Sequence, residues 1–482
     1  MFYRTNIIKK SDINLAFRKK ILCMAFLGIS ISLLLSPQLI VSAENKEGKS
    51  SPYNFFLPIA IRAGNSYYVS PQGSNNNPGT IIHPWRTIRK AASMVEPGDV
   101  VYIRDGVYQE SVNISTSGTG NSPIYFQAYP GENPVIDGNN FTIPDYDWGP
   151  LLTISGNYIR VSGVEVRYSR GMGVVLTGSF VVADNIYSHH NKENGILISR
   201  GHYSTVKNSL IWRNALSNEF GHGNNHSSGL SAARNGVTHA RISHNIVWEN
   251  WGEGVSSFEA DNIIIEDNII HDNYTANIYI SDSTYVICQS NFIYIDPTSY
   301  IFPYGEQVGI MLGDELYDPP SANLTIINNI ASGNRINLYW WQGSQGGGMN
   351  NVLIANNSFV NSITTSNIKI LRGDHQNVEI SNNIIQQDGQ LLIIIVEQNP
   401  DLSFINNLWS KTPPTAASGV GDVIGDPLLT HNGDQYSPEW YILTSFSPAI
   451  DGAFTLPEVE VDYFGNSREA IPDIGANEFF PY

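Results

Sequence analysis

The sequence is poor in cysteine and in basic residues, and both scarcities limit what the protein can be. Of its two cysteines, Cys23 lies in an apolar N-terminal run and Cys288 stands alone in the rest of the chain, so no disulfide framework is possible there. We expect Cys288 to be a buried small apolar residue. Lys and Arg number 27 against 44 Asp and Glu. This acidic balance disfavours nucleic acid and anionic membranes as partners.

The chain also lacks an apolar run long enough for a comfortable membrane span. The run ILCMAFLGISISLLL (21–35) follows RKK (18–20) and precedes the small residues VSA (41–43). This arrangement is typical of a secretory signal peptide over residues 1–43, with an uncleaved signal anchor as the alternative. Cleavage would remove six basic residues and one acid, and would take the formal net charge from −17 to −22. We therefore expect an exported protein, secreted or held at the cell surface, in which a polyanionic substrate needs a local basic patch or a bridging cation.

Helical periodicity is scarce, whereas a short motif built on asparagine recurs. It appears as ADNIYSHHN (183–191), SHNIVWENW (243–251) and EDNIIHDNY (266–274), among others. The leading asparagines are those at 185, 208, 245, 268, 291, 329, 357, 383 and 407, and their spacing returns to 23 between longer intervals. A fixed period of this length is the signature of a stacked repeat.

Each repeat holds three short β-rich runs, such as NIYIS, YVICQ and FIYID. Three strands per coil of about 23 residues predict an all-β chain folded as a right-handed parallel β-helix, in which the recurring asparagines form a ladder at one tight turn. Thr87–Val95 predicts a short amphipathic helix that caps the lower end. We expect a linker over 44–66, the capped β-helix over 67–410, and a C-terminal capping segment over 411–482. A capped solenoid needs no partner, so we expect a monomer.

The first strand of each coil can be stacked by sequence from GVVLTG (173–178) to NIKILR (367–372). Alternation sends the second and fourth residues inward and the third and fifth outward. The outward third position then reads Val175, Leu197, Ser231, Ser256, Tyr279, Met311, Tyr339 and Lys369. Insertions at 214–228, 294–307, 314–323 and 342–351 flank the same sheet, so they should wall a groove whose floor is this sheet.

The sixth position of the same stack places Glu259, Asp282 and Asp314 on consecutive coils, between arginines below and above. Charges about 4.8 Å apart repel by roughly 3–4 kcal/mol at an effective dielectric of about 20, so a bound cation, shared protons or the flanking arginines must neutralise them. These three acids are candidate calcium ligands. The alternative is a solvated polar turn, in which acids are common and their repulsion is screened.

Other residues of the predicted groove are candidates for catalysis or for substrate binding. Arg234 and His226 are candidate bases, and Glu253 is a candidate general acid or metal ligand, with ordinary turn or loop positions as the alternative. The candidate substrate-binding residues, by charge or by stacking on sugar rings, are Arg200, Tyr279, Tyr339, Trp341, Lys369 and Arg372.

Segments near the two ends resemble known proteins. The N-terminal stretches resemble the signature of secreted parallel β-helix proteins that include the family-nine pectate lyases; they are YYVSPQGSNNNPGT (67–80), HPWRTIRKAA (83–92), PGDVVYIRDGVY (97–108) and GENPVIDG (131–138). SPAIDGA (447–453), DYFGNSR (462–468) and PDIGANEF (472–479) resemble the C-terminal segment of bacterial exported β-helix proteins. The family's calcium-binding Asp cluster, often written DDGF, is absent, and WGEGVSSFE (251–259) stands in the corresponding region. No catalytic lysine can be carried over from the family.

Three functions follow as hypotheses. The first is a polysaccharide lyase that cleaves a uronate-containing glycan by β-elimination, with Ca²⁺ neutralising the uronate carboxylate. The second is a glycoside hydrolase that uses two carboxylates in the same groove. The third is an exported glycan-binding protein without catalysis, because the same solenoid also serves as a scaffold. In each case the partner is a polysaccharide or an oligosaccharide.

Overall fold

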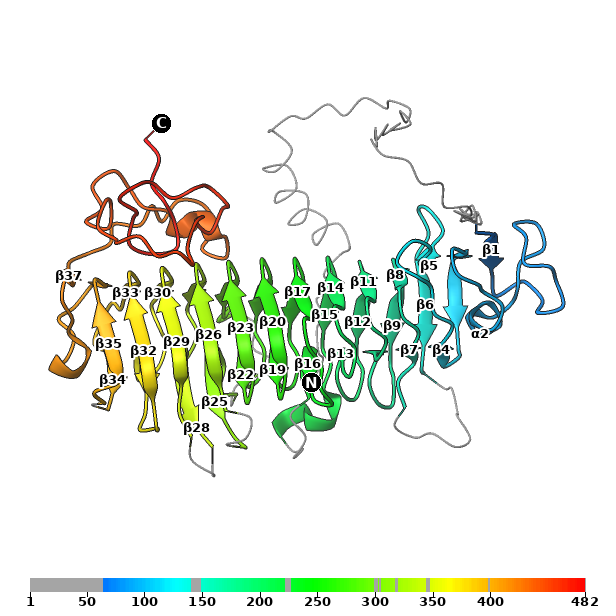
Figure 1. Ribbon diagram of the computed structural model, residues 1–482, viewed down its shortest axis with the longest axis horizontal. Helices are drawn as coiled ribbons and strands as arrows, with labels where there is room; N and C mark the ends of the chain where they lie inside the picture. The colour runs from blue at the N-terminus through cyan, green and yellow to red at the C-terminus, as the bar shows by residue number, and fades with distance from the viewer. Residues whose placement is uncertain are drawn as a thin grey trace, which may run out of the picture. The chain divides into compact units, whose positions relative to one another are not determined.

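The computed structural model describes residues 64–139, 149–221, 227–298, 302, 305–316, 320–343, 347–397 and 399–481. The predicted signal peptide and most of the predicted linker lie outside these residues. Within them, the chain forms a right-handed parallel β-helix whose strands follow one another in three parallel sheets, as Figure 1 shows. No helix in the described ranges is long and apolar enough to cross a membrane.

Nearly every coil contributes one strand to each of the three sheets. Sheet A consists of β1 (Ser66–Val69), β2 (Val100–Ile103), β5 (Ile124–Ala128), β8 (Ile159–Ser162), β11 (Val182–Asp184), β14 (Thr205–Lys207), β17 (Arg241–Ser243), β20 (Asp261–Glu266), β23 (Thr284–Gln289), β26 (Ala322–Ile327), β29 (Asn350–Ala355), β32 (Gln376–Ser381) and β35 (Leu402–Ile405). Sheet B consists of β3 (Gly106–Tyr108), β6 (Pro134–Asp137), β9 (Glu165–Arg167), β12 (Tyr187–His189), β15 (Leu210–Trp212), β18 (Ile246–Trp248), β21 (Ile269–His271), β24 (Phe292–Tyr294), β27 (Ile330–Ser332), β30 (Ser358–Val360), β33 (Ile384–Gln386), β36 (Leu408–Trp409) and β37 (Val423–Ile424). Sheet C consists of β4 (Val112–Ile114), β7 (Leu152–Ile154), β10 (Val174–Leu176), β13 (Ile196–Ile198), β16 (Leu230–Ala233), β19 (Val255–Phe258), β22 (Ala276–Ser281), β25 (Val308–Asp314), β28 (Ile336–Gln342), β31 (Ser366–Ile370) and β34 (Leu392–Val396).

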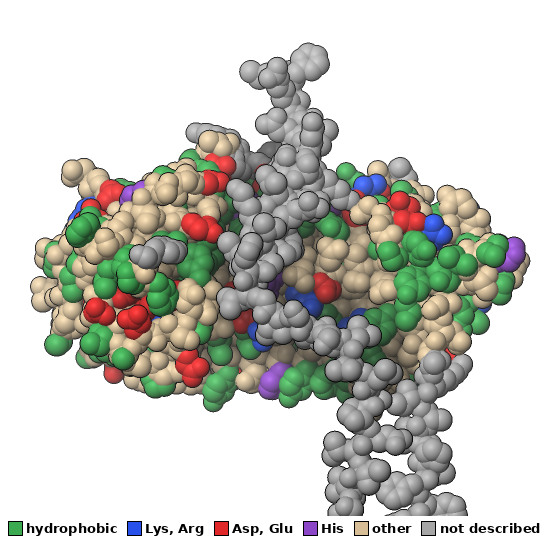
Figure 2. Space-filling model, turned by 90° about the horizontal axis from the view of Figure 1, so that it is seen from above, with side chains coloured by type: hydrophobic (Ala, Val, Ile, Leu, Met, Phe, Trp, Pro, Cys, Tyr) green, Lys and Arg blue, Asp and Glu red, His purple; other side chains and the backbone are tan. Residues whose placement is uncertain are grey.

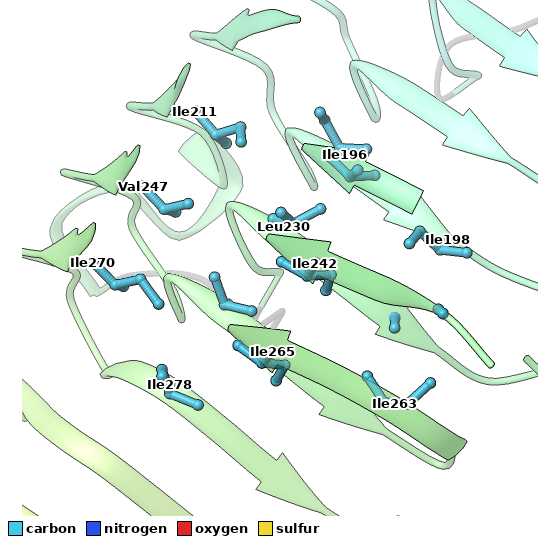
Figure 3. Packing of buried hydrophobic residues seen from close by; sticks show 14 of the residues in the cluster. Ile196, Ile198, Ile211, Leu230, Ile242, Val247, Ile263, Ile265, Ile270 and Ile278 are labelled. Carbon is cyan, nitrogen blue, oxygen red and sulfur yellow. The ribbon is translucent and has the colours of Figure 1, made fainter. Parts of the chain in front are cut away.

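The interior is filled by columns of aliphatic side chains that come from all three sheets (Figure 3). On sheet C, Ile196 pairs with Leu230, which is followed by Val255 and Ile278 on the next coils. All four are fully buried, and each such side chain stabilises the fold by about 1.5–3 kcal/mol relative to exposure. Cys288 is also fully buried and unpaired, as expected.

Buried asparagines connect the coils at the turn from sheet A to sheet B. The side-chain amide of each donates about 3.0 Å to the side-chain oxygen of the next, and that oxygen also accepts a backbone N–H, so both ends of the amide are satisfied. The ladder runs through Asn245, Asn268, Asn291, Asn329, Asn357, Asn383 and Asn407.

The predicted ladder was wrong at its first two members. Asn185 and Asn208 lie one position earlier in the coil, where the backbone adopts a left-handed conformation with φ of 55° and 52°. The ladder position of those coils is held by Ile186 and Ser209. Left-handed residues at tight turns are also commonly asparagine, which is why the two columns look alike in sequence.

A second ladder, not predicted, lies at the turn from sheet B to sheet C. Its amides are bonded over 2.8–3.0 Å through Asn191, Asn214, Asn250, Asn273, Asn277, Asn334, Asn337 and Asn367. Several of these residues close the repeating motif, as in the final asparagine of ADNIYSHHN, so the signal was present in the sequence.

The two ends of the β-helix are covered differently. At the N-terminal end, helix α2 (Ile88–Ala92) is shorter than predicted and buries Ile88, Ala91 and Ala92 against the first coils. Its N-terminus is capped by the carboxylate of Glu110, which accepts the backbone N–H groups of Ile88 (2.8 Å) and Arg89 (3.1 Å).

The C-terminal segment does more than cover the end of the β-helix, because most of it folds back along the earlier coils. The short 3-10 helix η2 (Thr415–Ala417) and strand β37 lie at the end, but residues 425–481, which include the 3-10 helix η3 (Pro438–Tyr441), pack along the flank on strands of sheet B. Left-handed asparagines of successive coils bind this segment through their side-chain amides, as Asn328 does to the carbonyl of Val461 and Asn382 to that of Phe454.

The described surface is predominantly acidic, as the composition predicts. On the face seen in Figure 2, Asp and Glu side chains are more widely spread than Lys and Arg. A remaining 3-10 helix, η1 (Leu216–Gly221), lies in the first inserted loop, before sheet C is entered.

The ladder predicts a large cost for one amide. Replacing Asn291 with Ala leaves one side-chain N–H and the backbone N–H of Asn268 without an acceptor, while the other side-chain N–H still donates to Ile242 O, so the free energy of unfolding should fall by about 2–4 kcal/mol. Urea denaturation measures the change, with Asn133→Ala, at an exposed position, as the control. Equal stability of the two variants would contradict the role given to the ladder.

Candidate active site

The predicted stack of sheet C strands is confirmed residue by residue. Adjacent strands pair along the outward third position from Val175 and Leu197 through Ser231, Ser256, Tyr279, Met311 and Tyr339 to Lys369. Ser231, Ser256, Tyr279 and Met311 are nevertheless buried, although they point away from the interior of the coil. The middle of this face is therefore covered, and Tyr339 and Lys369 are half-buried.

Asp282 serves the scaffold in this structure. It is fully buried, and its backbone takes a left-handed turn with φ of 51°. Its carboxylate accepts hydrogen bonds from the backbone N–H groups of Leu316 (2.8 Å) and Glu315 (3.2 Å) and from the hydroxyl of Ser281 (2.6 Å). Its own backbone N–H donates to Ser321 Oγ over 2.8 Å. The side chain thereby holds the loop that follows β25.

The other two predicted calcium ligands are also engaged with the protein. Glu259 has a left-handed backbone and lies 3.5 Å from Arg234 Nε. Asp314 is buried and accepts the backbone N–H of Gly348. Across the described ranges, no three His, Cys, Asp or Glu side chains are arranged to hold a metal ion. These residues therefore do not fit a calcium site as they are placed.

Of the two predicted bases, the structure describes only Arg234. Arg234 is exposed, lies over the ring of Phe258 at 5.0 Å and forms the ion pair with Glu259. The guanidinium is thus engaged with Glu259 and Phe258, and no hydrogen bond joins it to the network of Glu253 among the described residues. His226 lies outside the described residues.

Glu253, in contrast, lies at the centre of a buried polar network. Its carboxyl accepts a hydrogen bond from Ser228 Oγ (3.0 Å), which lies 2.7 Å from Ser256 Oγ, and Ser256 is in turn 2.7 Å from Ser231 Oγ. Burial raises the pKa of Glu253 from 4.5 to about 7, and the nearby carboxylates of Glu315 and Glu306 add to the rise. At neutral pH this side chain can therefore hold or release a proton.

Tyr279 lies one coil further along and completes the cluster. Its hydroxyl donates a hydrogen bond of 2.5 Å to Glu315 Oε1. Burial raises the pKa of the Tyr279 phenol, and the charge of Glu315 acts in the same direction. A carboxyl with a raised pKa and a phenol bonded to a carboxylate thus lie on neighbouring coils, which brings together groups that can donate and accept protons.

The remaining predicted substrate-binding residues line the same sheet further along the coils. Tyr339 and Trp341 are half-exposed and pack against Tyr279 and Met311. Lys369 places its Nζ 4.9 Å from the centre of the Tyr339 ring. Lys369 is four strands from Ser256, roughly 19 Å, so it would contact a different sugar from the one at Glu253.

Two predicted arginines lie at the edges of this surface. Arg200 is exposed and has a left-handed backbone with φ of 64°. Arg372 is also exposed, and its Nε lies 3.5 Å from Glu397. Neither side chain forms a hydrogen bond or ion pair with the described residues of the Glu253 network.

A cleft of about 640 Å³ opens beside the carboxyl ends of the later sheet C strands. Asp314, Asp374 and Asp401 line it, and its lining contains no Lys or Arg. It lies over the coils of β28, β31 and β34, several coils from Glu253. Because the buried carboxyl of Glu253 has a pKa raised to about 7, we place the chemistry at Glu253 and not in the cleft.

Sequence reasoning missed four residues of the cluster. Ser228 and Glu315 stand at the edges of insertions, and Ser231 and Ser256 were assigned only to the outward column. Hydroxyls at neighbouring outward positions on consecutive coils were the available signal, since outward positions do not require them for packing.

The assignment of Asp282 to the scaffold can be tested by removing its carboxylate. Asp282→Ala leaves the N–H groups of Glu315 and Leu316 without an acceptor, so the free energy of unfolding should fall by about 2–4 kcal/mol. Titration calorimetry with Ca²⁺ should give the same heats for this variant as for the unmodified chain. Asp374→Ala, at an exposed carboxylate, is the matched control. Loss of measurable Ca²⁺ binding in Asp282→Ala alone would make Asp282 a ligand.

The raised pKa of Glu253 predicts a pH-dependent stability. Because the folded state favours the protonated carboxyl, the stability contribution is fully present below pH 4.5 and is lost as the pH rises to about 7. A rise in pKa from 4.5 to about 7 corresponds to about 3 kcal/mol.

Glu253→Gln should therefore lack this part of the pH slope and should be more stable than the unmodified chain at pH 8. Urea denaturation at intervals from pH 4 to pH 8 measures both curves. Parallel curves over that range would show that Glu253 titrates normally.

Comparisons with known proteins identify the family of the chain. Residues 67–377, more than half of the chain, match the family model described as Pel9A-like, right handed beta helix region. Pectate lyase L of Dickeya chrysanthemi is 27% identical over 224 residues, covering 44% of this chain and 51% of the relative. Pectate lyase L of Paenibacillus polymyxa is 31% identical over 168 residues, covering 34% and 36%. The chain thus spans about half, or less, of the length of these relatives.

Solved structures agree in fold. The crystal structure of pectate lyase Pel9A has a TM-score of 0.52 at 20% identity, covering 87% of this chain and 97% of the other. XylC in complex with xylose has a TM-score of 0.51 at 13% identity, covering 86% and 98%. At these identities the likeness concerns the fold alone. With the family match over residues 67–377, the chain belongs to the Pel9A-like family of right-handed β-helix proteins.

Proposed function

We propose that this chain is an exported polysaccharide lyase that cleaves a uronate-containing glycan by β-elimination on the outward face of sheet C. Membership of the Pel9A-like family and the likeness to pectate lyase L support the reaction class. The observation that carries the proposal is the buried carboxyl of Glu253 beside the hydrogen-bonded pair of Tyr279 and Glu315.

β-Elimination needs a base at C5 of the uronate and an acid at the leaving oxygen O4. In the proposed step, the C5 proton moves to Tyr279 Oη while the phenol proton moves to Glu315 Oε1 along their hydrogen bond. The electrons of the C5–H bond form the C4=C5 double bond, and the C4–O4 bond breaks. Glu253 gives its proton to O4, and exchange with water later restores Glu253 and Glu315.

The hydroxyls around Glu253 position its carboxyl for this transfer. Ser228 donates to one carboxyl oxygen and is hydrogen-bonded to Ser256 on the next coil, which is hydrogen-bonded in turn to Ser231. Because these groups are buried, little water competes for the proton. Lys369 and the half-exposed Tyr339 offer charge and ring surface for other uronates along the sheet.

Calcium is the ion that the family resemblance implies for neutralising the uronate carboxylate. Since Glu259, Asp282 and Asp314 are occupied by contacts within the protein, we derive no step through calcium. The expected activity is therefore indifferent to a chelator.

One observation favours a hydrolase as the second candidate. Glu193 accepts a hydrogen bond from Ser227 Oγ (2.6 Å), and Glu253 accepts one from Ser228, so two buried carboxyls flank the Ser227–Ser228 pair from opposite sides. They come from coils two apart, roughly 9–10 Å along the stack. This is near the upper end of the separation, about 6.5–9.5 Å, that inverting glycosidases use.

The two candidates give different products from a panel of uronate and neutral glycans. The lyase produces an unsaturated sugar that absorbs in the ultraviolet, whereas the hydrolase produces reducing ends without absorbance. We expect absorbance that is equal with Ca²⁺ and with a chelator. Absorbance only with Ca²⁺ would restore a calcium mechanism, and reducing ends alone would favour the hydrolase.

Variants connect the activity to the cluster. Glu253→Gln and Tyr279→Phe should each lower kcat by about 100-fold or more, since each removes a proton donor or acceptor of the transition state. Tyr285→Phe is the matched control, because Tyr285 is 57% exposed and lies outside the cluster. If Tyr279→Phe is as active as the control, the base is a different group.

A further inference from the structure

A second cluster of potential chemistry lies on the outward face of sheet B, away from the candidate active site. Strand β12 ends at His189, and His190 follows with a left-handed backbone of φ 54°. Consecutive side chains of a regular strand point to opposite faces, but this turn residue brings its ring back. As a result, His189 Nδ1 and His190 Nδ1 are 2.7 Å apart, with the rings nearly perpendicular at 82°.

This spacing is that of a hydrogen bond and is slightly shorter than the spacing of a chelating pair. Two imidazole nitrogens bound at about 2.0–2.1 Å to one ion, at right angles to each other, are about 2.8–3.0 Å apart. A tetrahedral ion would hold them further apart, so the right-angled geometry that Cu²⁺ and Ni²⁺ prefer requires the smaller movement of the two rings. Without metal, a single N–H···N hydrogen bond joins the same pair. A bound ion would release this proton to water and would lie about 2.0–2.1 Å from each nitrogen, off the line that joins them.

The second ring nitrogen of His189, Nε2, contacts a carboxylate, as the second nitrogen of a metal-binding histidine commonly does. His189 Nε2 lies 3.2 Å from Glu165 Oε1, so this nitrogen donates its hydrogen to the carboxylate and leaves the Nδ1 lone pair facing His190. Glu165 is held by Arg167 Nη1 at 2.8 Å. Trp212 stacks on the His189 ring with centroids 4.1 Å apart and fixes its plane.

Access and local charge are compatible with a divalent ion. His190 is half-buried, and the ring of Tyr168 beside it, 5.3 Å away, is 40% exposed, so water can reach the pair. The neighbouring cations are partly offset by ion pairs, because Arg167 is paired with Asp137 and Glu165, and Arg213 with Glu249, although both arginines still disfavour positive charge at His190.

We propose that His189 and His190 chelate one divalent copper or nickel ion through their Nδ1 atoms, with Glu165 orienting His189 and water filling the other positions. The site is independent of the glycan chemistry, because it lies on a different sheet from Glu253. It is a two-histidine chelate supported by a carboxylate and not a cage of three protein ligands.

The test uses the full chain purified without a polyhistidine tag and stripped with a chelator. Titration calorimetry with Cu²⁺ and Ni²⁺ should show one ion bound per chain, and electron paramagnetic resonance of the Cu²⁺ form should show coupling to two nitrogens. His190→Gln should weaken binding at least 100-fold and leave one nitrogen. Glu165→Gln, which keeps both ligands, should weaken binding about 10–100-fold.

His83→Gln, at an exposed histidine outside the cluster, is the matched control and should bind as the unmodified chain does. Circular dichroism checks that each variant is folded. The proposal is overturned if the unmodified chain binds neither ion in stoichiometric amount, or if His190→Gln and Glu165→Gln bind as tightly as the control.

Discussion

The hydrogen bonding of buried asparagine amides between coils is the constraint on which the rest of this structure depends. A β-helix interior offers no water to a polar turn, so every amide placed there must find its partners on the coils above and below. Two ladders meet this requirement, one between sheets A and B and one between sheets B and C. They fix the register of neighbouring coils, and through it the alignment of the outward column on sheet C.

That alignment is what makes the candidate site possible. Because each coil presents its third residue at the same place, Ser231, Ser256 and Tyr279 come from distant parts of the sequence yet lie on neighbouring strands. Glu253 lies two residues before strand β19 and reaches the same surface, where burial raises its pKa. The scaffold thus supplies position, and the inserted loops supply the burial that turns an ordinary carboxyl into an acid for neutral pH.

The features predicted from sequence are those governed by the repeat. Strand register, the inward aliphatic columns and most of the ladder follow from the repeat period and from alternation. An error of one residue in the position of a turn is still possible, as at Asn185 and Asn208. The role of Asp282 could not be predicted, since its bonds are to the backbone of a loop whose path no periodicity specifies. The cluster at Glu253 also depends on loops. In the sequence, its only signal was the pair of serines, Ser231 and Ser256, in the outward column of sheet C.

The central claim is that the cluster of Glu253 and Tyr279 catalyses elimination. The most direct measurement is cleavage of a defined uronate oligosaccharide in water enriched in heavy oxygen, followed by mass spectrometry of both fragments. Elimination adds no water, so the summed fragments should have the mass of the substrate and carry no heavy oxygen. Fragments that together weigh one water more, with heavy oxygen at the new reducing end, would contradict the lyase and identify a hydrolase.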